Sequence, residues 1–318
     1  MGKRQVKVDF SGFWKDLDKD DNFFINTLRR EFEPVISEKP DYLFFSLFSD
    51  EYLNYDNDVI RIFYTGESQI PDFNLADYAL GFDWIDFGDR YIRFPLYNIY
   101  KGIPQLALSR GGMIDKPERR EKFCSFVCSN SKGDPIRFEF FKQLSERRSV
   151  DSGGRLCNNV GGPVRDKLSF EKEHRFSLCF ENSSYPGYTT EKILEAFAAG
   201  TIPIYWGDPE ISRVFNEKAF ISVRSGEDAE KVIERIIAID DDPILFNAML
   251  KENPFIQGNF PEDQTKAAEE FILNIFRQPK EAAFRRNRTF RGKNYELFFK
   301  RYCNINMKLR KIKHVFDK

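Results

Sequence analysis

Short apolar runs rich in β-branched and aromatic residues recur along the first third of the chain. They are VKVDF at 6–10, YLFFSLF at 42–48, VIRIFYTGE at 59–67 and YALGFDW at 78–84. Runs of this length, alternating with more polar helical patterns, predict buried strands joined in βαβ fashion. The stretch at 101–122 is broken by Gly and Pro and ends in charges, so it predicts a linker.

The alternation resumes after this linker. FCSFVCSN predicts a buried strand, and DPIRFEFFKQLSERR predicts a helix with Asp134 as its N-cap and Pro135 in the first position. RFSLCFEN and TIPIYWG predict two more strands around the helix TTEKILEAFAAG, which Gly200 ends. AFISV and the helical segments SGEDAEKVIERIIAI and DQTKAAEEFILNIFRQP complete the block. The pattern therefore predicts an α/β protein of two doubly wound, Rossmann-like domains that face each other across a cleft.

We expect an N-terminal domain at 1–118, a second domain at 119–284 and a basic tail or closing helix at 285–318. This last segment holds twelve Lys or Arg against two acidic residues, a net charge of +10. Because the whole chain carries −1, the rest carries −11. The chain as a whole therefore has no electrostatic reason to bind nucleic acid, and we expect none as a partner.

Aromatic and aliphatic residues interleave with the charges of this basic segment, as in a helix that lies on an anionic membrane surface. The alternative is a closing helix with a solvated basic face. No stretch approaches the ~20 apolar residues that a membrane-spanning helix needs, and no leader-like segment opens the chain. Five cysteines without C-x-x-C spacing favour a reducing compartment. We expect a cytoplasmic protein. If the basic segment is a membrane-surface helix, we expect peripheral attachment to the inner face of the cell membrane.

Histidine is nearly absent, because the chain contains only His174 and His314. Ser-His and Cys-His catalysis are therefore disfavoured, and a general base should be a carboxylate. The acidic groups Asp240-Asp241-Asp242 and Asp86-x-x-Asp89 read as a helix-ending turn and a surface loop, so we assign no metal ligand.

The stretch ENSSYPGYTTEK joins a predicted buried strand to a predicted helix. Asn182 and Tyr188 lie in this turn, beside the backbone amides that a helix N-terminus leaves unpaired, which makes an anion site. Lys192 falls in the first helical turn, where the helix dipole disfavours a cation unless an anion is bound. Glu191 beside it suits ribose hydroxyls. The alternative is an ordinary capping residue followed by a solvated lysine.

Arg137 lies in the first turn of the other predicted helix, which is again unfavourable for a cation without a nearby negative charge. Two cations in such positions suggest one bound diphosphate. An arginine fork binds phosphate bidentately and a lysine acts as a point charge, so the pair could neutralise a leaving group without a metal.

Three stretches carry a family resemblance. FSLCFENSSYPGYTTEKILEAFAAGTIPIYWGDP resembles the signature block of the α1,3-fucosyltransferases of glycosyltransferase family 10. IRIFYTGESQIPDFNLADYALGFDWIDFGDRYIRFPLY is similar to the acceptor-domain block of the bacterial members, and FVCSNSKGDPIR to the start of their donor domain. The resemblance covers most of residues 59–223 and implies the GT-B architecture, GDP-fucose as donor, and inverting transfer to a hydroxyl of an N-acetylglucosamine-containing glycan.

Position by position, the resemblance implies Glu67 as the catalytic base, and Arg137 and Lys192 facing the diphosphate. It further implies Asn182 and Tyr188 near the β-phosphate, and Glu191 on the ribose. From the residues alone, Glu67 ends a predicted strand, where α/β folds present functional side chains, but a solvated loop carboxylate is the alternative.

The sequence thus predicts a metal-independent, inverting α1,3-fucosyltransferase without a cofactor and with a Lewis X-like product. Three alternatives stay open: a glycan- or nucleotide-sugar-binding protein without turnover, a transferase with another GDP-sugar donor, and an α1,4 linkage. The N-terminal aromatics could stack on sugar rings or fill a core: Trp14, Phe23, Phe24, Phe44 and Phe45.

Overall fold

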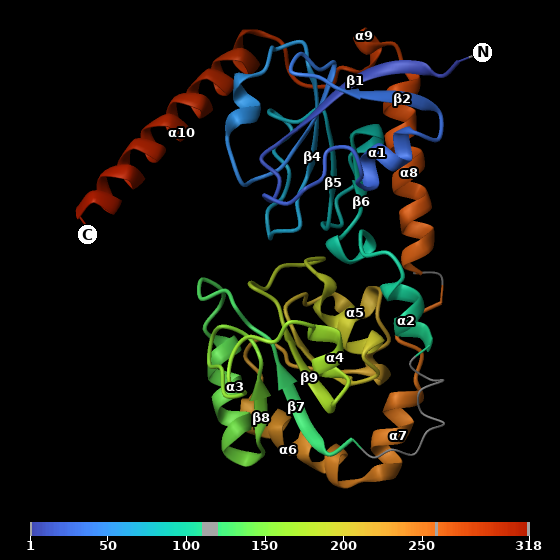
Figure 1. Cartoon of the computed structure of the whole chain (residues 1–318), viewed down its shortest axis with the longest axis vertical. Coiled ribbons are helices and arrows are strands. Elements are labelled where there is room, and N and C mark those ends of the chain that lie inside the picture. The colour runs from blue at the N-terminus through green and yellow to red at the C-terminus, as the bar shows by residue number, and fades with distance from the viewer. Residues whose placement is uncertain (1, 110–119, 258–259, 317–318) are drawn as a thin grey trace. The chain divides into compact units, whose positions relative to one another are not determined.

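A computed structural model of the chain describes residues 2–109, 120–257 and 260–316 (Figure 1). They form two compact units. Unit 1 comprises Met1–Gly81, Ile85–Phe94 and Lys266–Lys318, and unit 2 comprises Phe82–Trp84 and Pro95–Thr265. Each unit contains one parallel β-sheet with helices, which confirms the predicted class of two Rossmann-like α/β domains.

Unit 1 has strand order β2-β1-β3-β4-β5-β6, and every pair of neighbours is parallel. Its elements are β1 (Arg4–Ser11), α1 (Phe23–Leu28), β2 (Phe32–Ile36), β3 (Tyr42–Phe45), β4 (Ile60–Tyr64), β5 (Tyr78–Gly81), β6 (Tyr91–Arg93), α9 (Lys280–Ala283) and α10 (Phe290–Phe316). β2 contains Pro34, which a parallel sheet tolerates at its edge, where β2 lies.

Unit 2 has strand order β11-β10-β9-β7-β8, again with parallel neighbours. Its elements are α2 (Ile103–Ser109), β7 (Lys122–Phe126), α3 (Ile136–Arg147), β8 (Val150–Ser152), α4 (Lys167–Glu171), β9 (His174–Phe180), α5 (Glu191–Ala198), β10 (Ile202–Trp206), β11 (Ile221–Ser222), α6 (Ala229–Asp241) and α7 (Pro243–Lys251). Figure 1 shows α3 beside β8, the strand that follows it, and α5 packs on β9, the strand that precedes it. Gly200, with φ +70°, follows the end of α5 as predicted.

α8 (Pro261–Arg277) departs from the expected domain limits. The sequence pattern placed this segment in the second domain, but residues from Lys266 onward group with unit 1. The physical reason is aromatic packing, since Phe276 of α8 stacks on Tyr42 of β3 with ring centroids 4.1 Å apart. The expected N-terminal domain at 1–118 also differs, since its described residues from Pro95 onward group with unit 2, and part of the expected linker at 101–122 forms α2. The expected limit at 118/119 lies outside the described residues.

The start of the expected basic tail is built into unit 1. Asp77 Oδ1 accepts hydrogen bonds from the backbone N–H groups of Arg285 and Arg286, at 2.9 and 2.7 Å. In α10, Glu296 forms an ion pair of 2.5 Å with Arg61, whose side chain is fully buried. Removing this segment would leave buried charges unpaired, which is costly. Residues 285–303 therefore include a closing helix, one of the two predicted alternatives.

Each unit has its own apolar core. In unit 1 the core includes Phe45, Phe63 and Ala79, and in unit 2 it includes Phe126 and Phe180. No helix in the described part of the chain combines the length and apolar character needed to cross a membrane.

Candidate functional site

The sheet order of unit 2 brings two segments that are far apart in sequence to one place. β7 and β9 are neighbours in the sheet. α3 connects β7 to β8 in one direction along the strand order, and α5 connects β9 to β10 in the opposite direction. In open parallel sheets, ligands bind at the carboxyl ends of the strands where the chain direction reverses in this way. Five residues gather there, and we call them the α5 site: Arg137, Glu181, Asn182, Thr190 and Lys192.

Arg137 is 2% exposed and spans the two segments. Its Nη1 donates to Asn182 Oδ1 at 2.5 Å, and its Nη2 donates to Cys128 Sγ at 2.7 Å and to the carbonyl oxygen of Asn130. Among the described residues no carboxylate pairs with this guanidinium, and its Nε has no hydrogen-bond partner. A buried cation without a counter-ion is expensive, so the arrangement suits a bound anion.

Lys192 has a different environment from the one that the sequence predicted. Its Nζ donates to Glu181 Oε2 and to Thr190 Oγ1, each at 2.8 Å, and lies 4.0 Å from Glu191 Oε1. Glu181 therefore supplies the negative charge that we had expected only from a ligand. Of the two predicted cations, Lys192 is thus neutralised within the protein, and only Arg137 lacks a carboxylate partner among the described residues.

The charges of the α5 site are coupled through burial. Burial alone would lower the pKa of the Lys192 ammonium, but the carboxylates of Glu181 and Glu191 raise it above its usual value, so this group stays charged. Burial alone would raise the pKa of Glu191, but the ammonium groups of Lys192 and Lys167 hold it below its usual value. Burial raises the pKa of the Cys128 thiol despite the nearby Arg137, so this sulfur stays protonated.

Gly133 leaves the space that the Arg137 guanidinium occupies. A Cβ atom at Gly133 would lie 2.1 Å from Arg137 Nη1 and 3.1 Å from the carbonyl oxygen of Asn182. The closest atom is the end of a flexible side chain, so a methyl group there would displace the guanidinium rather than the backbone.

We expect Gly133→Ala to weaken nucleoside diphosphate binding by roughly tenfold or more, because a charge-assisted hydrogen bond is worth about 1.5–3 kcal/mol. The thermal unfolding midpoint should stay close to that of the unaltered chain. Titration calorimetry and thermal unfolding measure the two quantities, and Lys132→Ala, at an exposed neighbouring position, is the control. Unchanged affinity in Gly133→Ala would contradict this role of Gly133.

The remaining two residues predicted for this site also lie in unit 2. Glu191 is the first residue of α5 and its side chain is 21% exposed. Tyr188 is buried, and its ring packs edge-on against Phe82 with centroids 5.1 Å apart. Asp208 holds the intervening loop, since its carboxylate accepts from Gly187 N at 2.8 Å and from the Thr189 hydroxyl at 3.1 Å.

Glu67, the predicted base, belongs to unit 1. The preceding strand β4 ends at Tyr64, so Glu67 lies in the loop after it and not in the strand as predicted. Its backbone N–H donates to Thr65 Oγ1 at 3.1 Å. Its side chain is exposed, and its carboxylate accepts no hydrogen bond from any residue that the structure describes.

Most of the N-terminal aromatics fill the core of unit 1, one of their two predicted roles. Phe24, Phe44 and Phe45 are buried there, and Phe23 stacks on Phe94 at 4.7 Å. Trp14 is 36% exposed and packs edge-on against Phe13 with ring centroids 5.5 Å apart, so stacking on a sugar ring stays a prediction for this residue.

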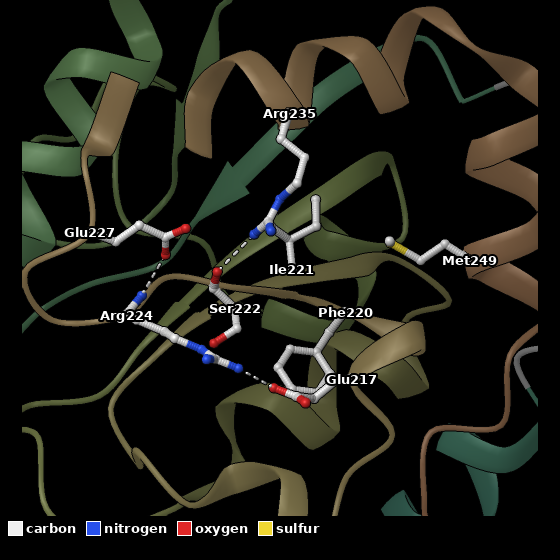
Figure 2. Close-up of a pocket in the computed structure, with 8 residues that line it drawn as sticks. All are labelled: Glu217, Phe220, Ile221, Ser222, Arg224, Glu227, Arg235 and Met249. Atoms are coloured by element: carbon white, nitrogen blue, oxygen red, sulfur yellow. Dashed lines mark hydrogen bonds and ion pairs between the residues drawn. The ribbon is translucent and has the colours of Figure 1, made fainter. Parts of the chain in front are cut away.

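A separate hollow of about 330 Å³ lies beside β11 in unit 2 (Figure 2). Arg224 Nη2 pairs with Glu217 Oε1 at 2.9 Å, and Arg235 Nη2 donates to the carbonyl oxygen of Ser222 at 2.9 Å. These cations already have partners within the chain, so we assign this hollow no ligand.

The acidic groups that the sequence read as a turn and a loop have structural partners. Asp240 pairs with Arg175 at 2.9 Å at the end of α6, and Asp242 caps α7. Asp89 pairs with Arg285 at 2.5 Å. The described residues contain no group of three or more His, Cys, Asp or Glu side chains placed to hold a metal ion.

Sequence reasoning missed three residues of this region: Glu181, Gly133 and Asp208. Glu181 was visible as the first letter of ENSSYPGYTTEK, an acidic residue directly after a buried strand. From the sequence, this carboxylate could equally be exposed to solvent. Its burial follows only from the folded structure. Gly133 and Asp208 gave no comparable signal.

Models of two protein families match the chain. Residues 8–100 match the N-terminal domain of α-(1,3)-fucosyltransferase FucT, and residues 117–254 match the C-terminal part of glycosyltransferase family 10 (fucosyltransferase). Together the two matches cover more than half of the chain, and the second contains the whole α5 site.

Related sequences and solved structures agree with these matches. The α-(1,3)-fucosyltransferase FucT of Helicobacter pylori is 36% identical over 233 residues, which are 64% of this chain and 48% of that protein. A putative fucosyltransferase of Acanthamoeba polyphaga mimivirus is 31% identical, over 49% of this chain and 27% of that protein. The chain thus spans about half or less of the length of these relatives.

A crystal structure of an α1,3-fucosyltransferase with GDP-fucose is also similar, with a TM-score of 0.71 and 27% identity. The match covers 86% of this chain and 91% of that one.

Proposed function

The chain belongs to glycosyltransferase family 10, the fucosyltransferases, and we propose that it is an inverting α1,3-fucosyltransferase. Its donor would be GDP-fucose, and its acceptor the N-acetylglucosamine of an N-acetyllactosamine-type glycan, giving a Lewis X-like product. The similar crystal structure contains GDP-fucose, which supports this donor.

The observation that carries the proposal is the buried Arg137 guanidinium, which donates to Asn182 in the segment that leads to α5. It has a spare N–H donor at Nε and no carboxylate partner among the described residues. A diphosphate would offset its charge and accept from the N-terminal amides of α5, whose N-cap Thr190 does not cap them with its side chain. Asn182 and Tyr188 would border the β-phosphate, and Glu191 would accept from the ribose hydroxyls.

In the proposed reaction, the Glu67 carboxylate takes the proton of the acceptor hydroxyl. The hydroxyl oxygen then forms a bond to C1 of fucose, while the bond from C1 to the β-phosphate oxygen breaks on the opposite face. GDP leaves with the electron pair of that bond, and Arg137 and Lys192 stabilise its negative charge. These two cations supply positive charge at the leaving group, so we propose that the reaction needs no metal ion and no cofactor.

The decisive experiment is incubation of the purified chain with GDP-fucose and N-acetyllactosamine in the presence of EDTA. The proposal expects an acceptor heavier by one deoxyhexose, with an α1,3 linkage by linkage analysis. GDP-fucose binding without product would favour the non-catalytic alternative. Competition with GDP-mannose tests the other donor, and an α1,4-linked product would correct the linkage.

We also propose that α10 contacts an anionic membrane surface with its outer face. Glu296 and Cys303 face unit 1, whereas Phe290, Phe298 and Ile305 are 79%, 68% and 58% exposed. These three apolar residues occur near one side of a helix whose segment carries the +10 charge. Apolar insertion and electrostatic attraction together support binding to the inner face of a cell membrane.

This surface predicts sedimentation with anionic vesicles at low salt and reduced recovery at high salt. Phe298→Ser should lower the bound fraction, because burying an aromatic side chain contributes about 1.5–3 kcal/mol. Truncation after Asn306 removes the basic residues of 307–318. It keeps Arg285, Arg286 and Glu296, whose bonds join this segment to the rest of unit 1. Neutral vesicles are the control, and equal recovery of all three proteins would leave α10 as a closing helix only.

A further inference from the structure

Glu181 is the most completely bonded side chain of the α5 site. Its carboxylate is fully buried. Oε1 accepts from the backbone N–H of Thr190 at 2.7 Å, and Oε2 accepts from the Thr190 hydroxyl at 2.8 Å and from Lys192 Nζ at 2.8 Å. One carboxylate thus bonds both the residue before α5 and the cation in its first turn.

The backbone fixes the direction of this carboxylate. The Glu181 N–H donates to the carbonyl oxygen of Trp206 at 2.9 Å, which ties it to the end of β10. Gly207, with φ +153°, packs directly on the side chain, since a Cβ there would lie 2.5 Å from Glu181 Cγ. The absence of a side chain at Gly207 lets Glu181 reach α5.

The bonds of Glu181 have two consequences for the first turn of α5. The Thr190 hydroxyl is turned toward Glu181 and Lys192, and its oxygen makes no cap hydrogen bond to α5, so the first-turn amides lack that acceptor. Lys192 receives a counter-ion that holds its ammonium at Thr190, the N-cap of α5, near a helix end where the dipole would otherwise disfavour a cation. Amides and ammonium together are the groups that a diphosphate needs.

We propose that Glu181 is a positioning residue for donor binding, which keeps the first turn of α5 uncapped and holds Lys192 in place for the diphosphate. This inference rests on the proposed function, because it assigns the α5 site to a nucleoside diphosphate. Glu181 acts through Thr190 and Lys192 and does not itself contact the donor.

The test is a double-mutant cycle on GDP affinity, measured by titration calorimetry. Glu181→Gln keeps the shape but replaces one acceptor with an NH₂ group facing Lys192, so GDP should bind roughly 10- to 100-fold more weakly. In a Lys192→Ala background the same change should cost clearly less than in the unaltered chain, because only the bonds from Glu181 to Thr190 then remain. Losses that simply add would overturn the proposal.

Asp240→Asn is the matched control, because Asp240 is another buried, ion-paired carboxylate of unit 2. It should lower the thermal unfolding midpoint and leave GDP affinity unchanged, which separates positioning from general stability. Should Glu181→Gln not fold, Glu181→Asp keeps the charge but is one methylene too short to bond Thr190 and Lys192 together, and it should also bind GDP more weakly.

The outcomes distinguish failure of the proposed function from failure of the proposed role of Glu181. If the unaltered chain binds no GDP, the proposed function and this inference both fail. If it binds GDP and transfers fucose, but Glu181→Gln and Glu181→Asp bind GDP as tightly as the unaltered chain, only the role of Glu181 is overturned.

Discussion

Replacing Arg137 with lysine should lower turnover with GDP-fucose by about 10²- to 10³-fold, as the loss of one preorganised donor to a developing charge does elsewhere. The guanidinium donates to Asn182, Cys128 and Asn130 at once, and its Nε has no partner in the part of the chain that the structure describes. A lysine is a point charge on a flexible stem and cannot reproduce this fork. The positive charge is kept, so the variant tests geometry rather than net charge.

Steady-state kinetics with varied GDP-fucose measure the effect. Arg148→Lys is the control, because Arg148 follows the other end of α3 and pairs with Asp241 at 2.7 Å, away from the α5 site. It should retain nearly full turnover. A wild-type kcat and KM in Arg137→Lys would remove the main support for the diphosphate site. Lys192→Ala should lose turnover to a similar extent, and its full activity would remove Lys192 from the leaving-group role.

Replacing Glu67 with alanine should abolish most transfer and leave donor binding intact. A positioned general base contributes about 10²- to 10⁴-fold, so turnover should fall by that factor. Glu67 lies in unit 1 and the α5 site lies in unit 2, and we assign the carboxylate to the acceptor hydroxyl. Calorimetry should therefore find the same GDP affinity in Glu67→Ala and in the unaltered chain.

Glu51→Gln provides the comparison, because it removes another exposed carboxylate of unit 1. It should leave turnover unchanged. Two results would reassign Glu67: full activity of Glu67→Ala would exclude a base, and lost GDP binding would place the residue with the donor. The same measurements on Glu67→Gln distinguish the loss of the base from the loss of side-chain volume.

Local pattern determined most elements of the fold. The runs at 6–10, 42–48, 59–67 and 78–84 contain strands, although β3, β4 and β5 each end three residues earlier than predicted. Their apolar side chains are buried on a sheet. Hydrophobicity and β-propensity are local properties that predict such buried strands. The short edge strands β2, β6 and β8 escaped prediction, because few buried residues define them.

Long-range pairing was beyond such reasoning. Asp77 looks like a loop carboxylate in the sequence, yet it accepts from Arg285 and Arg286, more than 200 positions away. The segment that contains Arg285 and Arg286 groups with unit 1, as do the residues of α8 from Lys266 onward. Nothing local specifies these partners, since they are selected by which surfaces remain unburied after the sheet has formed.

The sequence by itself placed Arg137 and Lys192 each in the first turn of a helix that follows a buried strand. Only the tertiary structure decided that β7 and β9 are neighbours, which brings Arg137 to Asn182. It also decided that Glu181 is buried against Lys192, whereas Arg137 is left without a carboxylate among the described residues. The physical reason is that charge and helix position are local properties, whereas desolvation and the choice of counter-ion depend on every segment packed around a group.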